Sequence, residues 1–418
     1  MHMPSHKGEG FLGCECLDIT EINGADALYS ASGIIKESEE NASVCFGCKT
    51  LYSTEGSSHC IRAMLYLLKL HGVTRFIAGR NAHKAFISAC ALLDISPIWL
   101  YGEGESYLSC NINLEHLKAL ISQSEEKTAL FITSPDYLGN IADLTEISQI
   151  CLKNNVLLCV DNAHGAYLNF LKNSLHPIAL GASLCCDSAH KTLPVLTGGA
   201  YLHISPNAPR IFTERAKDAL ALFGSTSPSY LILQSLDKAN LYLSDYKERL
   251  ADFLTEVEEI KKHLTAVGYT LIGDEPLKIT VSAKEYGYYG YELAEVLEKL
   301  GIFCEFADRD FLVLMLSIEN KKEGLSRLLD AMSAIEKRQK ISEAPPAPHP
   351  ARAKMTIREA VFADREEVNA TDALGRVLAE FNIACPPAVP IAVCGEEIDE
   401  NALKCFEYYG ITRLFVVK

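Results

Sequence analysis

The sequence has little of what several large protein classes need. Its 39 lysines and arginines are outnumbered by 54 aspartates and glutamates, which gives a formal net charge of −15. This balance argues against nucleic acid and anionic membranes as partners, because both attract basic surfaces. No apolar run reaches the roughly 18 residues of a membrane span, and no signal peptide opens the chain. We therefore expect a cytoplasmic protein that binds neither nucleic acid nor a membrane.

The cysteines lack a regular framework. There are 15 of them, an odd number, and Cys159, Cys185 and Cys186 fall in apolar runs typical of buried strands. Such usage indicates free thiols in a reducing compartment rather than a disulfide scaffold. Cys45 and Cys48 form one CxxC pair, but metal sites usually need a second ligand pair at matching spacing, and none is evident. We therefore predict no metal, and the role of this pair stays open.

What the chain does have is an ordinary globular composition, with 418 residues, 48% hydrophobic and 22% charged. This length predicts two or three domains. Strand and helix patterns alternate from about residue 50 to 205, which predicts an α/β sheet covered by helices on both faces. The expected domains are a large N-terminal domain (1–235), a small α+β domain (236–340), a proline-rich linker (341–353) and a C-terminal α+β unit (354–418).

A lysine follows one of the predicted strands. The apolar run at residues 182–186 predicts a buried strand, and Ser188, His190 and Lys191 come directly after it. A lysine at the mouth of a buried sheet loses solvation, so its pKa falls toward the range in which the amine is nucleophilic. Such an amine can form a Schiff base with a carbonyl cofactor. Taken alone, the same residues fit a surface lysine in a strand–turn–strand, which is the commoner case.

Gly56, Ser57 and Ser58 stand where a helix is predicted to begin. The apolar residues that follow recur at i, i+3, i+4 and i+7, the spacing of one helical face. Free backbone N–H groups and the helix dipole attract an anion to such an end. A phosphate is one suitable anion, and the alternative is ordinary helix capping by serine.

His83 and Asp161 also follow predicted strands, which span residues 75–78 and 156–160. Ligands of parallel α/β sheets bind at these strand ends. A carboxylate directly after five apolar residues is costly unless a cation pairs with it, and a protonated pyridine nitrogen is one such cation. In isolation, His83 fits a helix cap or a surface group, and Asp161 fits a turn cap.

Together these four features meet the needs of pyridoxal phosphate. The cofactor needs a lysine for its aldehyde, an acid for its ring nitrogen, a helix N-terminus for its phosphate and a flat group over its ring. A chance arrangement that puts all four groups at one edge of a sheet is less expected than the chance placement of any one of them. We therefore predict pyridoxal 5'-phosphate as the cofactor.

With these residues in place, the chain resembles the bacterial ornithine/lysine/arginine decarboxylases, pyridoxal-phosphate enzymes of the aspartate-aminotransferase fold. The resemblance runs nearly end to end. It implies a three-layer α/β/α large domain with a mostly parallel sheet. The matching motifs begin at Met3 (MPSHKG), Asp18 (DITEI), Gly33 (GIIKES), Gly56 (GSS), Arg80 (RNAHK), Thr133 (TSPDYLG), Asp161 (DNAHG), Ser188 (SAHKTLP), Arg358 (REA), Ala384 (ACPP) and Gly395 (GE).

The resemblance also implies a role for each matching residue. Lys191 would carry the cofactor, Asp161 would hold its ring nitrogen protonated, and His83 would stack on the ring. The other residues implied at the cofactor are Gly56, Ser57, Ser58, Ala163, His164, Ser188, His190 and, from the partner subunit of a dimer, Thr226 or Ser227. The implied reaction is decarboxylation of lysine, arginine or ornithine by a homodimer or higher homo-oligomer, with Lys191 or His83 returning a proton to the α-carbon.

Some motif positions differ from the usual family pattern. Ser5 replaces a glycine, Asn162 a glutamate, Ala388 a glycine and Cys394 a proline. These changes leave the core cofactor residues in place, but they leave the substrate open. Two other functions also stay open. An aminotransferase or other lyase on this fold commonly clamps the α-carboxylate with an arginine, which the sequence does not place. A silent regulatory relative should have lost Lys191 or Asp161, and both are present.

Overall fold

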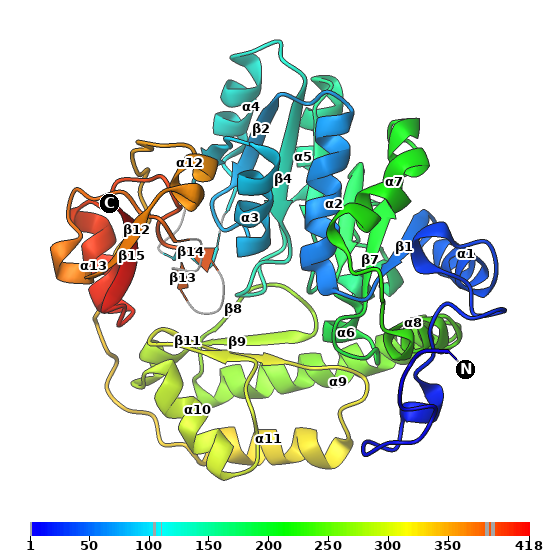
Figure 1. The fold of residues 1–418 in the computed structure, drawn as a ribbon. Coiled ribbons are helices and arrows are strands. Elements are labelled where there is room, and N and C mark those ends of the chain that lie inside the picture. The colour runs from blue at the N-terminus through cyan, green and yellow to red at the C-terminus, as the bar shows by residue number, and fades with distance from the viewer. Residues whose placement is uncertain (1, 103–105, 110, 381–383, 386–388) are drawn as a thin grey trace. The chain divides into compact units, whose positions relative to one another are not determined.

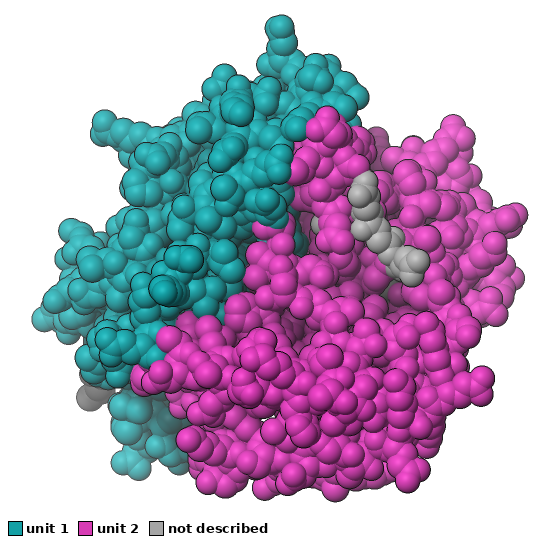
Figure 2. Space-filling model, turned by 180° about the vertical axis from the view of Figure 1, so that it is seen from behind, with its two compact units in different colours: residues 1–77, 118–134, 143–248 teal, residues 78–117, 135–142, 249–418 magenta. Residues whose placement is uncertain are grey.

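The computed structural model describes residues 2–102, 106–109, 111–380, 384–385 and 389–418 (Figure 1). The chain divides into two compact units, which Figure 2 colours separately. Unit 1 comprises residues 1–77, 118–134 and 143–248, and unit 2 comprises residues 78–117, 135–142 and 249–418. The domain limits expected from the sequence stay predictions.

The main sheet has, among the described residues, seven strands in the order β1-β7-β6-β5-β4-β2-β3. Strands β4, β5 and β6 are parallel, whereas β7 runs antiparallel to both β1 and β6. Because β7 opposes both neighbours, β1 and β6 end at the same edge of the sheet. The strands are β1 (Lys49–Ser53), β2 (Arg75–Gly79), β3 (Ile98–Leu100), β4 (Thr128–Thr133), β5 (Leu157–Asp161), β6 (Leu184–Asp187) and β7 (Ala200–Ile204).

Helix α2 covers the sheet over β6 and β7 and packs beside α7 within unit 1 (Figure 1). Its inner face is fully buried and includes Ile61, Met64, Leu65 and Leu68, the apolar positions that predicted it. The helices of this unit include α1 (Ile34–Phe46), α2 (Gly56–Leu70), α5 (Leu144–Lys153), α6 (Ala189–Thr192), α7 (Arg210–Phe223) and α8 (Tyr230–Tyr242), with the short 3-10 helices η1 (Glu15–Leu17), η2 (Leu28–Ser30) and η3 (Ala166–Phe170).

Unit 2 contains a four-stranded antiparallel sheet in the order β10-β11-β9-β8. Its C-terminal part pairs β12 with β15 and β13 with β14. The strands are β8 (Leu271–Ile272), β9 (Lys278–Ser282), β10 (Phe306–Ala307), β11 (Phe311–Met315), β12 (Arg365–Asn369), β13 (Ala384–Cys385), β14 (Val389–Pro390) and β15 (Arg413–Val417). The helices are α3 (Lys84–Leu93), α10 (Gly290–Lys299), α11 (Lys322–Ala334), α12 (Ile357–Phe362) and α13 (Glu400–Tyr408), with η4 (Ala283–Tyr286) and η5 (Ala370–Asp372).

Two helices have residues in both units, α4 (Leu114–Ser122) and α9 (Tyr246–Val267). Helices α8 and α9 are separate elements, with residues 243–245 between them. No helix in the described part of the chain combines the length and the apolar character needed to cross a membrane.

The predicted fold class is confirmed, since the structure is an α/β protein with a mostly parallel sheet. The pattern analysis did not identify helix α1. Its N-terminus is held by Asp26, whose carboxylate accepts the backbone N–H groups of Gly33 (2.8 Å) and Ile35 (3.1 Å). Because this cap lies several residues before the helix, the segment lacks the local start signal by which a helix is recognised in a sequence.

Candidate active site

Three loops at one edge of the main sheet carry the predicted residues of unit 1 other than Thr226. They follow β1, β5 and β6, and the register pairs Asp161 with Cys186 across β5 and β6. Residues Ser57 and Ser188, which are distant in sequence, meet there, with the Ser188 hydroxyl donating to the Ser57 hydroxyl at 2.8 Å. The structure therefore brings the start of α2 and the segment after β6 together, as the sequence predicted.

The N-terminus of α2 fits an anion better than it fits simple capping. The residue before the helix is Glu55, whose side chain makes no capping hydrogen bond. Ser57 and Ser58 lie inside the first turn and are half-buried, so they do not act as the cap. Their hydroxyls and the N–H groups that a helix start leaves without an intrahelical partner are the donors that a phosphate needs.

A glycine turn supports this helix start. Gly198 has a positive φ of 99°, and a Cβ atom there would lie 2.8 Å from the Thr54 carbonyl oxygen. The carbonyl of Gly198 accepts the N–H of Gly56 at 2.7 Å. The next carbonyl, of Gly199, lies 3.0 Å from His190 Nδ1, and a carbonyl only accepts, so His190 donates through Nδ1. The turn therefore fixes the His190 ring beside the helix start.

Asp161 is the last residue of β5 and is 2% exposed. Its Oδ1 accepts the N–H of Ala163 at 3.2 Å and the thiol of Cys186 at 3.6 Å. The contact with Ala163 is that of a turn cap, the role that Asp161 was expected to have if taken in isolation. Burial raises the pKa of the carboxyl to about 6, and the charge of Lys191 partly opposes that rise. A buried acid of this kind gains much from a further cationic partner.

Lys191 lies in α6, which begins two residues after β6 ends. Its Nζ is 2.8 Å from Nε2 of His164, a residue that is 5% exposed. The Lys191 side chain itself is exposed to solvent, so the loss of solvation expected for it is not seen here. The reason is local: the short helix carries the lysine beyond the strand end at which the sequence argument had placed it.

The remaining predicted residues are found in three further places. His83 belongs to unit 2, where its Nδ1 accepts the N–H of Ala85 at 3.1 Å and caps α3. Ala163 is half-buried in the turn after β5, and Thr226 is exposed in the loop between α7 and α8. Their roles at the cofactor stay predictions. The motif position Ala388 lies outside the described residues.

The sequence analysis missed a buried group of two histidines and an aspartate. His176, Asp187 and His203 place their side-chain nitrogen and oxygen atoms within 4.8 Å of one another. Asp187, like Asp161, is a carboxylate directly after an apolar run, and this was the one available signal. Of the CxxC cysteines, Cys48 borders this group, with its Sγ 3.6 Å from Nδ1 of His203, and neither cysteine is in a disulfide.

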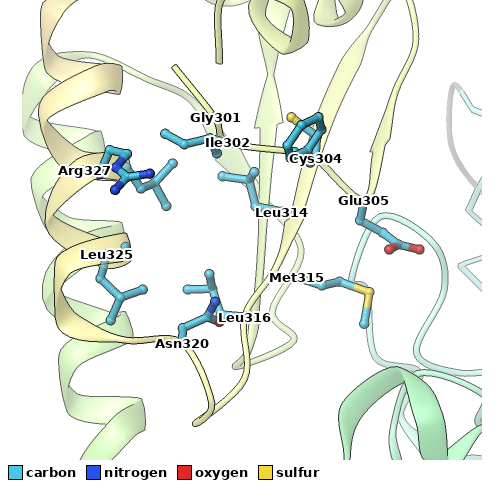
Figure 3. Close-up of a pocket in the computed structure, with 13 residues that line it drawn as sticks. Gly301, Ile302, Cys304, Glu305, Leu314, Met315, Leu316, Asn320, Leu325 and Arg327 are labelled. Atoms are coloured by element: carbon cyan, nitrogen blue, oxygen red, sulfur yellow. The ribbon is translucent and has the colours of Figure 1, made fainter. Parts of the chain in front are cut away.

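A cavity of about 330 Å³ lies elsewhere, in unit 2 (Figure 3). Leu325 and Arg327 of α11 line one side, and Leu314 and Met315 of β11 line another. None of the predicted site residues is among its lining residues. The strand-end loops of unit 1, rather than this cavity, therefore contain the candidate active site.

The start of α2, a buried acid and a lysine amine thus lie at one edge of a mostly parallel sheet, the place where ligands of α/β enzymes bind. The chain belongs to the Orn/Lys/Arg decarboxylase family, whose major domain matches residues 8–273. Members of this family are amino-acid decarboxylases.

Two relatives and one solved structure show how far the similarity extends. The uncharacterized protein YaaO of Bacillus subtilis (strain 168) is 30% identical over 93% of this chain and 84% of its own length. An arginine decarboxylase of Halalkalibacterium halodurans is 30% identical over 96% of this chain and 88% of its own length. The structure of Escherichia coli constitutive lysine decarboxylase is similar with a TM-score of 0.77 and 17% identity, over 100% of this chain and 79% of that chain. At this identity the structural likeness shows the fold.

Proposed function

We propose that the protein is a pyridoxal-phosphate-dependent decarboxylase that converts lysine, arginine or ornithine into the corresponding amine and carbon dioxide. The observation that carries the proposal is the placement of a buried carboxyl, Asp161, and the Lys191 amine where neighbouring strands end, near enough for the lysine charge to lower the Asp161 pKa. The family of amino-acid decarboxylases to which the chain belongs supports it, as does a relative named arginine decarboxylase.

The residues present fit the cofactor. The α2 start, with Ser57 and Ser58, would hold the phosphate together with Ser188 and His190. Lys191 would bind the aldehyde covalently. The fit is clearest at Asp161, because a carboxyl whose pKa burial raises to about 6 becomes more favourable when a protonated ring nitrogen pairs with it.

Pyridoxal phosphate, when bound, supplies an electron sink for the pair of electrons left behind as carbon dioxide departs. The protein's own residues manage the protons. Nζ of Lys191 lies 2.8 Å from Nε2 of His164, close enough for a proton to pass from the ammonium to the imidazole. We infer that His164 accepts this proton and leaves Lys191 as the neutral amine that covalent attachment requires. Lys191 or His83 then returns a proton to the α-carbon.

We also propose that the protein acts in the cytoplasm as a homodimer or larger homo-oligomer. The hydroxyl-rich loop at Thr226 is exposed within one chain, and in the dimer it would reach the phosphate of the partner subunit. The net charge of −15 suits a substrate with a cationic side chain, and we infer that an acidic residue meets the distal cation.

The test is a substrate panel of arginine, lysine, ornithine and the uncharged analogue norleucine, with pyridoxal phosphate present. We expect stoichiometric carbon dioxide and amine from at least one basic amino acid, and little from norleucine. Lys191→Ala, the matched control, should lose turnover. Formation of a keto acid without carbon dioxide would show an aminotransferase instead. Comparable turnover of norleucine and lysine would contradict recognition of a distal cation.

A further inference from the structure

Asp187 is a second buried carboxylate, and it ends β6 beside Asp161. The side chains of His176, Asp187 and His203 are all 0% exposed, and we call these residues the His–Asp–His cluster. Nε2 of each histidine lies 3.1 Å from the same atom, Asp187 Oδ2. Burial alone would raise the pKa of this carboxyl, but the two imidazoles hold it well below its usual range. Asp187 is therefore ionised deep inside unit 1.

Hydrogen bonding accounts for the cluster without a metal ion. The backbone N–H of Ile178 donates to Nδ1 of His176 at 3.4 Å, so the proton of a neutral His176 sits on Nε2, facing Asp187. Nδ1 of His203 lies 2.9 Å from the hydroxyl of Thr50 on β1. Each imidazole nitrogen therefore has a partner within the protein. The ring of Phe46 packs against both imidazoles, with centroids 5.8 Å from that of His176 and 4.6 Å from that of His203.

The other oxygen of Asp187 connects the cluster to the candidate active site. Asp187 Oδ1 accepts a hydrogen bond from the Asn162 side chain at 2.7 Å. Asn162 is 0% exposed and directly follows Asp161, and its backbone N–H donates to the Cys186 carbonyl at 3.0 Å. Asp187 itself directly precedes Ser188. One ionised side chain thus connects the turn after Asp161 with the segment that leads to Lys191.

We propose that the His–Asp–His cluster is a positioning network, in which Asp187 acts through Asn162 and its own backbone to hold Asp161 and the Lys191 segment in place for the cofactor. The inference rests on the proposed function. Three titratable side chains at full burial are expensive for stability, and apolar residues could fill the same volume at less cost. This cost in stability is explained if the three side chains hold the ends of β5 and β6 in one arrangement.

The test compares two variants with a matched control in the full chain. Asp187→Asn removes the charge, and Asn162→Ala removes the connection but leaves the cluster intact. The control is Glu39→Gln, since Glu39 is a carboxylate of unit 1, 2% exposed, that pairs with Lys217 Nζ at 2.6 Å on other elements. The measurements are the stability of the cofactor-free protein, the dissociation constant of pyridoxal phosphate, the absorption spectrum of the bound cofactor, and the metal content.

We expect Asp187→Asn and Asn162→Ala to weaken cofactor binding at least about 10-fold, the loss of one charge-assisted hydrogen bond, and to change the spectrum. Glu39→Gln should lower stability while cofactor affinity stays within about 2-fold of wild type. If Asp187→Asn fails to fold, the result for Asn162→Ala decides the question, because the His–Asp–His cluster is intact in that variant.

Wild-type affinity and spectrum in both variants would show that the cluster only stabilises the fold, and would overturn the proposal. One equivalent of a transition metal in the wild type, lost in His203→Gln, would overturn it in favour of a metal site. Failure of the proposed function has a different signature, because it appears as the absence of carbon dioxide from every basic amino acid with the wild-type protein.

Discussion

Replacing Asp161 with asparagine should stabilise the cofactor-free protein while damaging the enzyme. The carboxyl is 2% exposed and its pKa is raised to about 6 by burial, against an ordinary value of about 3.9. The folded protein therefore resists ionising a group that the unfolded chain ionises freely. Asparagine keeps the shape and the acceptor oxygen for Ala163 N–H, but it carries no charge to bury.

The sign and size follow from linkage. Because the folded pKa lies above the unfolded one, the contribution of Asp161 to stability is full below pH about 4 and is lost as pH rises through about 6. Two pKa units correspond to about 3 kcal/mol. We therefore expect Asp161→Asn, without cofactor, to be more stable than wild type by about 2–3 kcal/mol at pH 8 and equal to it near pH 4.

Bound cofactor should reverse this order of stability between the wild type and the variant. A protonated ring nitrogen would pair with the wild-type carboxylate, so pyridoxal phosphate should stabilise the wild type more than the variant. The variant should still bind the cofactor but decarboxylate at least ~100-fold more slowly, since it loses a charge that acts in the transition state. The assays are urea unfolding at the two pH values and single-turnover carbon dioxide release. A cofactor-free variant less stable than wild type at pH 8 would refute the reasoning, as would an unchanged single-turnover rate.

Three further outcomes are expected. Asp26→Asn should lower the unfolding free energy by about 1–2 kcal/mol at pH 7. Because backbone donors hold the Asp26 pKa at about 2 against the effect of burial, this difference from wild type should shrink as pH falls from about 4 to about 2. A pH-independent difference in urea unfolding would contradict this expectation. Glu396→Gln should cost about 3–5 kcal/mol because it leaves Arg80, 3.0 Å away and 5% exposed at its side chain, without its buried partner; a loss below 1 kcal/mol would contradict this. Ser188→Ala should weaken pyridoxal phosphate binding about 10-fold with stability nearly unchanged, as measured by absorbance titration, and unchanged affinity would exclude Ser188 from the phosphate site.

Several strands could be predicted to within two residues, because their physical signal is local. The strands expected at residues 75–78, 156–160 and 182–186 are observed as β2, β5 and β6. The helix start at Gly56 was also predictable, since its apolar face repeats with the helical period. What these elements share is that neighbouring residues alone decide where they begin and end.

Other features depend on contacts between distant residues. Helix α1 is capped by Asp26 from several residues upstream, so no local pattern indicates its start. His176 and His203 meet Asp187 only because β6 and β7 pair and the loop before β6 folds under them. The exposure of Lys191 depends on the short helix α6, which is too short to show a helical repeat of apolar residues in the sequence. Sequence patterns therefore located the strand-end groups but not the network that holds them.

The covalent role of Lys191 is the central claim, and one measurement tests it most directly. The protein is loaded with pyridoxal phosphate, reduced with borohydride and digested, and the modified peptide is identified by mass spectrometry. The account predicts one phosphopyridoxyl group per chain, attached to Lys191, and none in Lys191→Ala. A group attached to another lysine, or an unmodified chain, would contradict it.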